Sequence, residues 1–384
     1  GAIRLQAYNE PVDGAETAWF YSQVQIGHGG SYQSAPAGGG SFTLPSTATV
    51  SGTPDNSTSG HITVLSGGTY VDARYADPLD PLSKIGISAQ GGTGQYDYAQ
   101  IGHGGANQRA ATNAGFQGNI DVQATQGDIF FSGGLDARVA SDSGYGRNHA
   151  QIGHGGRDVD GVKGGTISVL AGQGMDATDG DIIFIAGKHV ESFAQIGHGG
   201  VLSGGGVDSL LNAAKIDVMA LGDIRFESGQ SGETNALETS VGYANYWFNY
   251  TTGTVMIGHG GYEADGSMLF SQDITVTSGT GDLADTDGNA LTGGITFISG
   301  DQDRNFAQIG HGGHNNGAND ADGFSGDITL RSNGGGITFD GSIVGGTRYQ
   351  RTSNGISLDG STNAARTVTA REAGFESYIQ IGHG

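Results

Sequence analysis

The hexapeptide Gln-Ile-Gly-His-Gly-Gly, first found at residues 25–30, recurs along the chain and decides how the rest of the sequence is interpreted. Five copies are complete, one has Met256 in place of Gln, and the last, at residues 380–384, lacks the final Gly. Successive histidines are 44 to 75 residues apart. A fixed motif with variable spacing indicates one structural position that the chain revisits, with loops of free length between visits. The motif residues are His28, His103, His154, His198, His259, His311, His383, Gln25, Gln100, Gln151, Gln195, Gln308 and Gln380.

The composition excludes several classes of protein. The 384 residues include 74 Gly, many at the ends of short apolar runs, where turns need positive φ or a close backbone approach. The net charge is −22, which argues against nucleic acid and against anionic membrane surfaces as partners. The lack of Cys excludes disulfides and thiolate metal sites. No apolar run approaches the roughly 20 residues of a transmembrane helix, so we expect no membrane span in this segment.

Two short apolar patterns recur between copies of the motif, and a third leads into it. In each, apolar and polar residues alternate, which indicates half-buried strands. The first pattern begins at Ile62, Ile120, Ile167, Ile216, Ile274 and Ile328. The second begins at Ile85, Ile129, Ile182, Ile224, Ile295 and Ile337. The third consists of Val24/Ile26, Ala99/Ile101, Ala150/Ile152, Ala194/Ile196, Val255/Ile257, Ala307/Ile309 and Ile379/Ile381.

Two repeat folds fit these patterns. A β-propeller has antiparallel blades, whereas a parallel β-helix stacks equivalent strands about 4.8 Å apart. The variable repeat length favours the helix, as do the shared Ile-x-Val/Phe patterns and a chain that starts at a second strand and ends after a third without caps. We therefore expect an all-β, right-handed parallel β-helix (β-solenoid) of about seven coils, each with three short strands and long variable loops. Residues 1–384 would be a single β-helix segment of a longer array, with 31–60 as a surface insertion.

Three strings resemble the shafts of filamentous-haemagglutinin-type bacterial exoproteins. They are Gly-Asp-Ile-Arg-Phe-Glu-Ser-Gly at 222–229, Asp-Ile-Thr-Val-Thr-Ser-Gly at 273–279 and Gly-Gly-Ile-Thr-Phe-Ile-Ser-Gly at 293–300. The resemblance covers strands throughout residues 60–340. It implies a parallel β-helix shaft at the bacterial cell surface that serves adhesion or filament building. The histidine hexapeptide is not expected of that family.

The seven histidines would form a column along the helix axis. The Ile and His of each motif share parity, so an unbroken strand would point both inward, whereas a break at a flanking Gly would turn the His outward. Two imidazolium ions about 4.8 Å apart repel by about 3.5 kcal/mol at an effective dielectric of about 20, so we expect mostly neutral rings. A hydrogen-bonded structural ladder is the favoured interpretation. Metal binding and catalysis are the alternatives, and no Ser or Cys nucleophile keeps a fixed spacing to the His.

The Gln of each motif should face away from the neighbouring Ile. An amide ladder would follow, in which each Gln side chain bonds the next coil. Aromatic residues precede four of these glutamines, and we expect them to stack and stiffen the shaft, with a carbohydrate platform as the alternative. They are Tyr98, Phe193, Phe306 and Tyr378.

Acidic Asp/Glu-x-Asp-Gly turns follow three copies of the motif. They contain part of a calcium-binding loop but lack the distant bidentate Glu of an EF-hand, and Asx turns explain them equally well. The candidate calcium ligands are Asp158, Asp160, Glu263, Asp265, Asp320 and Asp322. Paired carboxylates could also serve a polysaccharide lyase or glycosidase, although no Lys or Arg recurs beside them.

The sequence therefore predicts a structural or adhesive segment of an extracellular bacterial surface protein or filament. Its partners would be neighbouring copies or flanking repeats end to end, together with cell-surface glycans. We expect no enzymatic activity, no catalytic residues and no cofactor apart from the calcium named above. The alternative is a carbohydrate-binding or polysaccharide-processing β-helix module that uses the acidic loops.

Overall fold

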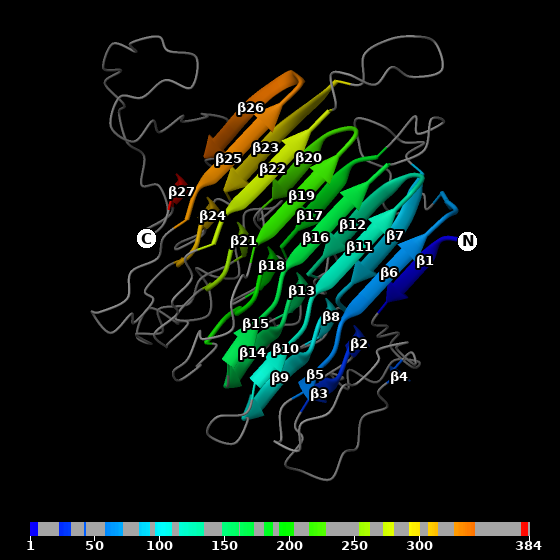
Figure 1. Ribbon diagram of the computed structural model, residues 1–384, viewed down its shortest axis with the longest axis vertical. Coiled ribbons are helices and arrows are strands. Elements are labelled where there is room, and N and C mark those ends of the chain that lie inside the picture. Colours follow the sequence, from blue (N-terminus) through cyan, green and yellow to red (C-terminus); the bar gives the residue numbers. More distant parts are fainter. Residues whose placement is uncertain are drawn as a thin grey trace, which may run out of the picture.

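The computed structural model describes residues 1–6, 23–31, 42–43, 58–71, 84–92, 97–109, 115–133, 148–160, 162–172, 180–186, 192–202, 215–227, 253–261, 272–279, 292–299, 306–313, 326–341 and 378–382. These residues form strands and no helices. Every strand pair among them is parallel, and only an isolated bridge between Tyr70 and Ile85 is antiparallel. Parallel pairing is incompatible with propeller blades, so the prediction of a parallel β-helix is confirmed (Figure 1).

Three long sheets run along the axis, and each collects one strand from every coil (Figure 1). The first sheet contains β6 (Ile62–Ser66), β11 (Ile120–Ala124), β16 (Ile167–Ala171), β19 (Ile216–Ala220), β22 (Ile274–Ser278) and β25 (Ile328–Ser332). The second contains β1 (Ile3–Gln6), β7 (Ile85–Gln90), β12 (Asp128–Ser132), β17 (Ile182–Ile185), β20 (Ile224–Glu227), β23 (Gly293–Ser299) and β26 (Gly334–Gly341). The third contains β4 (Phe42–Thr43), β2 (Gln23–Ile26), β8 (Tyr98–Ile101), β13 (His149–Ile152), β18 (Phe193–Ile196), β21 (Thr254–Ile257), β24 (Phe306–Ile309) and β27 (Tyr378–Ile381).

The core lies between these three sheets and repeats from coil to coil. In the first sheet, Ile120 pairs with Ile62 on one side and Ile167 on the other, so like side chains stack. The inward Phe131, Phe184, Phe226 and Phe297 of the second sheet stack with ring centroids 4.8–4.9 Å apart. This spacing equals the distance between paired strands, so strand pairing and ring stacking require the same separation between coils.

One predicted register is wrong. The sequence pattern aligned Ile85 and Ile87 with the inward pairs of the second sheet, but Ile87 and Ala89 occupy those positions. A register shift opposite Asp128 displaces Ile85, which joins a separate apolar cluster with Phe130 and Ile183. A β-bulge changes the side-chain parity along one strand without breaking the apolar pattern, so alternation alone does not reveal it.

Two small sheets extend one corner of the coil, where the chain passes from the third sheet to the first. The outgoing strands are β3 (Gly29–Ser31), β9 (Gly104–Arg109) and β14 (Gly155–Asp160), and the returning strands are β5 (Thr58–Ser59), β10 (Gly115–Gln117) and β15 (Val162–Gly164). The predicted insertion at 31–60 begins in β3, contributes β4 to the third sheet and ends in β5, and its other residues lie outside the described parts.

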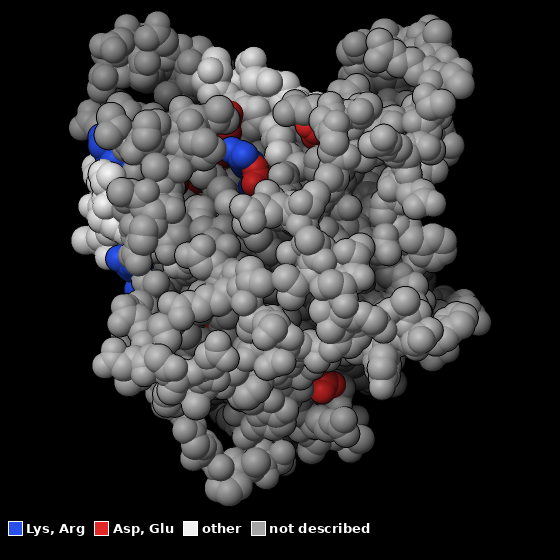
Figure 2. Space-filling model, turned by 180° about the vertical axis from the view of Figure 1, so that it is seen from behind, with Lys and Arg blue, Asp and Glu red and all other residues white. Residues whose placement is uncertain are grey.

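In the view from behind, the Lys, Arg, Asp and Glu side chains of the described residues form isolated spots and no continuous patch (Figure 2). Within those same residues, no helix is long and apolar enough to cross a membrane.

The Gly that precedes each motif His has a backbone conformation that L side chains rarely adopt. Gly102 and Gly153 have φ of +157° and +158°. A Cβ at Gly153 would overlap the carbonyl oxygen of Gly197 in the next coil. Glycine at this position therefore lets successive coils approach closely and turns the chain out of the third sheet.

We predict that Gly153→Ala destabilises the chain by more than about 3 kcal/mol, because it adds backbone strain to an overlap with a neighbouring coil. Gly67→Ala is the matched control, since its Cβ would meet only the Thr125 hydroxyl at 3.8 Å. Chemical denaturation of both variants measures the effect. Equal midpoints for the two variants would contradict the role assigned to Gly153.

Candidate functional site

The motif histidines form a continuous stack inside the protein. Ring centroids of successive histidines from His28 to His311 are 4.7–5.1 Å apart, with planes within 17° of parallel. The rings of His103, His154, His198, His259 and His311 are fully buried. His383 lies outside the described residues. The prediction of a histidine ladder is therefore confirmed, and the hydrogen bonds of its rungs show what it does.

From His103 to His311, one ring nitrogen of each motif histidine accepts a hydrogen bond from the coil before. The backbone N–H of His103 donates to Nδ1 of His154 at 3.0 Å, and the N–H of His154 donates to Nδ1 of His198 at 2.9 Å. The same bond joins His28 to His103, His198 to His259 and His259 to His311 at 3.0–3.2 Å. A nitrogen that accepts an N–H carries no proton, so these rings are neutral and are protonated at Nε2.

The other ring nitrogen donates across the corner to the start of the first sheet. Nε2–H of His154 donates to the carbonyl oxygen of Gly118 at 2.8 Å, two residues before β11. Equivalent bonds run from His103 to Gly60, from His198 to Gly165 and from His311 to Gln272, at 2.7–3.0 Å. The rings therefore reach from the third sheet to the first, which answers the question of direction that the sequence left open.

Together the two bonds hold both ends of a chain segment. We call residues 29–59, 104–117, 155–164 and 260–271 the corner segments. Each begins directly after a histidine whose N–H is held by Nδ1 of the next ring, and each ends directly before a carbonyl held by Nε2–H of that same ring. The segment 104–117, for example, runs between His103 and Gly118, and His154 binds both. A single imidazole thus closes the base of each corner segment.

Burial keeps the rings neutral well below neutral pH. Desolvation by burial is the main cause that lowers the pKa of His103 and of His198 to about 4, against the hydrogen bonds to Gly60 and Gly165, which raise it. For His154, burial again lowers the pKa well below its ordinary value, and the neighbouring His198 and His103 lower it further. Repulsion between neighbouring imidazolium ions, which the sequence suggested as the reason for neutral rings, lowers the pKa of His154 less than burial does.

The motif glutamines form a second ladder beside the rings. The side-chain N–H of Gln100 donates to the carbonyl oxygens of Gly153 and Gly155 at 2.9 and 3.0 Å, and to the side chain of Gln151 at 3.3 Å. Gln25, Gln151 and Gln195 each bond two glycine carbonyls of the next coil in the same way. The amide ladder is therefore tied mainly to the backbone around the next histidine, and side-chain contacts between glutamines are secondary.

Aromatic rings stack next to the glutamines. The ring centroids of Tyr98 and His149 are 4.7 Å apart, and those of His149 and Phe193 are 4.6 Å apart. The sequence pattern did not predict His149 here, because the other aromatic residues expected in this column are Phe and Tyr. Burial lowers the pKa of His149 to about 3, with a smaller effect from Arg157. Tyr98, Phe193 and Phe306 are buried, so they do not form a carbohydrate platform.

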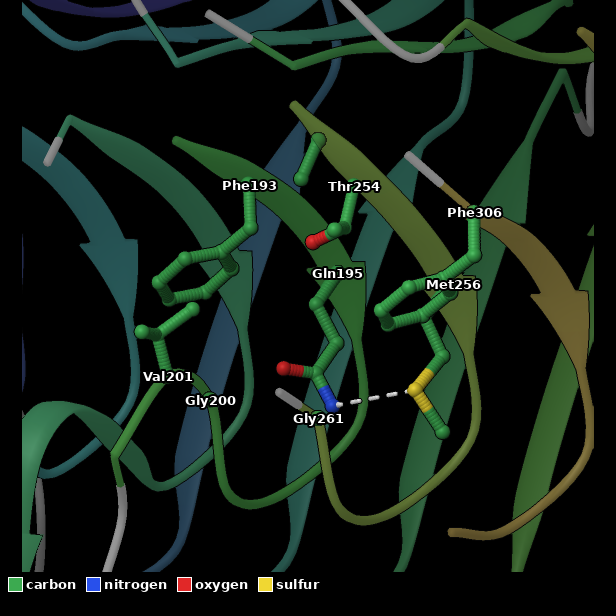
Figure 3. Close-up of a pocket in the computed structure, with 9 residues that line it drawn as sticks. Phe193, Gln195, Gly200, Val201, Thr254, Met256, Gly261 and Phe306 are labelled. Carbon is green, nitrogen blue, oxygen red and sulfur yellow. Dashed lines mark hydrogen bonds between the residues drawn. The ribbon is translucent and has the colours of Figure 1, made fainter. Parts of the chain in front are cut away.

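One coil lacks both the aromatic ring and the glutamine side chain that neighbouring coils have at these positions. Thr254 stands where Phe193 and Phe306 have rings, and Met256 stands where Gln195 has an amide (Figure 3). A small pocket results, lined by Phe193, Ala194, Gln195, Gly200, Val201, Thr254, Met256, Gly261 and Phe306. The Gln195 side-chain nitrogen lies 4.0 Å from the Met256 sulfur, and Met256 offers no N–H to the next coil (Figure 3). His259 remains in this coil, so the imidazole bond persists where the amide bond is lost.

Four rungs of the ladder have no ring nitrogen left to bind a metal ion. Both nitrogens of His103, His154, His198 and His311 are engaged with the backbone, so no lone pair faces a metal. No three His, Asp or Glu side chains gather into a metal site within the described ranges. Of the candidate calcium ligands, Asp158 and Asp160 lie in β14, while Glu263, Asp265, Asp320 and Asp322 lie outside the described residues.

A third ladder at another corner was missed at the sequence level. Before the second sheet, Asp128 Oδ1 accepts the N–H of Asp181, and Asp181 Oδ1 accepts the N–H of Asp223. Asp223 in turn accepts the N–H of Gly294. The signal was the recurring Gly-Asp before the second strand, which alone does not distinguish a turn from an acceptor column.

Comparison with family models, with curated proteins and with solved structures finds no match for this chain. The resemblance to filamentous-haemagglutinin-type exoproteins therefore stays a prediction.

We predict that His154→Ala destabilises the chain by about 3–5 kcal/mol. The substitution leaves the buried N–H of His103 and the carbonyl of Gly118 without their partner and opens a cavity in the stack. His61→Ala is the control, because His61 also accepts a backbone N–H through Nδ1, at 3.0 Å from Asn119, but is exposed. Chemical denaturation should show a loss for His61→Ala of about 1 kcal/mol at most.

Stability should fall in mild acid. Unfolded histidines have a pKa of about 6.5, and the folded values for His103 and His198 are about 4, so the unfolded chain binds protons first as pH falls. Their contribution is complete above about pH 6.5 and is lost between there and pH 4, by about 3 kcal/mol per ring. Unfolding midpoints between pH 8 and pH 4 measure this loss.

A midpoint that stays constant from pH 6.5 to pH 4 would refute neutral buried rings. A parallel titration with a chelator tests calcium at Asp158 and Asp160, since bound calcium would stabilise the fold and its removal would lower the midpoint at every pH.

We predict that Met256→Gln raises stability by about 1 kcal/mol, because the new amide can donate to the carbonyls of Gly310 and Gly312 as Gln195 does to Gly258 and Gly260. The reverse change, Gln195→Met, should lower stability by about 1–3 kcal/mol. Denaturation midpoints of the two variants should move in opposite directions, and a loss in both would contradict the amide ladder.

Proposed function

We propose that this chain is a structural segment of the shaft of an extracellular bacterial surface protein or filament, with a role in adhesion and without enzymatic activity. The main observation behind the proposal is that the polar side chains of the repeated motif form hydrogen bonds with other groups of the protein. Its imidazoles and amides bind backbone groups of adjacent coils, so the most repeated polar groups of the chain serve axial cohesion.

The last described coil supports association along the axis. Ile328, Leu330, Ile337 and Phe339 are only partly buried, and Ile381 is 39 % exposed, whereas their counterparts in inner coils are buried. A further coil stacked on β25, β26 and β27 would cover these side chains and could pair with the edges of these strands, which are the last of their sheets among the described residues. Flanking repeats or neighbouring copies, end to end, are the partners that this surface fits.

The bacterial surface location rests on the resemblance of residues 222–229, 273–279 and 293–300 to filamentous-haemagglutinin-type shafts. Adhesion would then depend on the residues between the strands of the coil, with cell-surface glycans as the proposed ligands.

Electron microscopy across a concentration series tests the axial role. We expect rods that lengthen by end-to-end association as concentration rises. Leu330→Lys, at the partly exposed end, should abolish the lengthening, and Met219→Lys, at an exposed side position of the first sheet, should not. Particles of one length at every concentration, or equal effects of the two variants, would contradict the proposal.

A further inference from the structure

The imidazole ladder holds the ends of the corner segments, whereas other interactions hold the three long sheets together. The three long sheets are held by backbone hydrogen bonds and an apolar core. The corner segments leave and re-enter the coil at groups that a histidine ring holds. A change in the ring therefore acts first on the corner segments.

We propose that the imidazole ladder is an acid-operated latch, in which protonation of the rings frees both ends of the corner segments while the three long sheets stay paired. The inference is independent of whether the chain associates end to end.

The hydrogen bonds of the neutral ring explain why protonation would open the latch. Protonation adds a hydrogen to Nδ1, which faces a backbone N–H at 2.9–3.2 Å, so a hydrogen bond is replaced by two opposed donors. The proton comes from solvent, and no covalent bond to the protein forms or breaks. Moving the charged ring into water relieves this conflict, and the ring then no longer holds either end of its segment.

The groups that face the rings reinforce the response. Above and below each ring is another imidazole at 4.7–4.9 Å in the interior of the stack, so two neighbouring cations repel. From β15, the ammonium group of Lys163 also lowers the pKa of His154 and of His198. From the first-sheet side, His103, His154 and His198 meet the uncharged carbonyls of Gly60, Gly118 and Gly165. The burial that lowers the pKa of His103 and His198 to about 4 sets the range in which the latch opens.

Carboxylates are a second kind of ionisable side chain that binds the backbone, and those of Asp128, Asp181 and Asp223 form a column of their own. They accept backbone N–H groups before the second sheet, at a different corner from the rings. Asn at these positions keeps an acceptor oxygen and removes the ionisable carboxyl group. The variant Asp128→Asn, Asp181→Asn, Asp223→Asn therefore separates their effect from that of the ladder.

Hydrogen exchange of the full chain, followed by mass spectrometry from pH 7 to pH 4 and corrected for intrinsic exchange rates, tests the latch. We expect protection of residues 104–117 and 155–164 to fall at least tenfold by pH 4, while β11, β16 and β19 keep theirs. The loss should reverse at pH 7, and the triple Asn variant should respond as the parent does.

A ring without nitrogen supplies the second test. His154→Phe keeps a stacking plane but binds neither His103 nor Gly118, so residues 104–117 should already exchange at pH 7 while residues 155–164, held by His198, stay protected. Unchanged protection of the corner segments of the parent at pH 4 would overturn the proposal. Loss of protection in β11 and β16 at the same pH as in the segments would also overturn it, because the chain would then be unfolding as a whole.

Discussion

The structure depends on one hydrogen-bonded unit, an imidazole held between a backbone N–H of the coil before and a carbonyl at the start of the first sheet. Histidine suits this position because its neutral ring carries an acceptor and a donor on opposite edges of a rigid plane. The plane also stacks at the distance set by strand pairing, so the ring satisfies the geometry of the sheet and of the corner at once. Glutamine has both kinds of group, but its longer side chain loses more rotamer freedom when it is fixed.

The residues of the motif differ in how much the coil depends on them, and the coil that contains Met256 shows which one can be replaced. That coil keeps Ile257, Gly258 and His259 but has no amide. Gly258 has φ of +155°, and a side chain there would overlap the carbonyl of Gly310. The glycine allows the close approach of neighbouring coils, and the histidine supplies hydrogen bonds to the backbone. The glutamine amide adds further hydrogen bonds between coils, and the coil of Met256 lacks them.

Most of the fold could be predicted from the sequence because the strands obey two simple rules. Apolar residues alternate within each strand, and equivalent strands repeat the same residues, so both the inward faces and the coil register follow, as the stack of Ile120, Ile167 and Ile216 illustrates. The direction of the histidine could not be predicted, because parity holds only while the chain stays extended and Gly153 leaves the extended conformation of an L residue. The same limit explains Ile85, where a bulge changes parity within a strand.

The site was harder to predict than the fold, because its partners come from residues without distinctive side chains. The ring of His154 binds the backbone of His103 and Gly118, and no side-chain pattern marks a backbone group as a ligand. What the sequence did show was the stacking of like rings, which requires neutral imidazoles whatever their partners are. The column that includes His149 was overlooked because a histidine between Tyr98 and Phe193 acts there as a flat ring.

The variable length of the corner segments is compatible with the same hydrogen-bonded unit. Because one ring holds both ends of a corner segment, the ends are fixed in space whatever the length between them. The entropy cost of closing a chain segment rises by only about 0.6 kcal/mol for each doubling of its length, so a longer corner segment adds little to that cost. Two hydrogen bonds to buried backbone groups outweigh that difference. This corner can therefore accept segments of different lengths while the histidines at its base stay stacked in register.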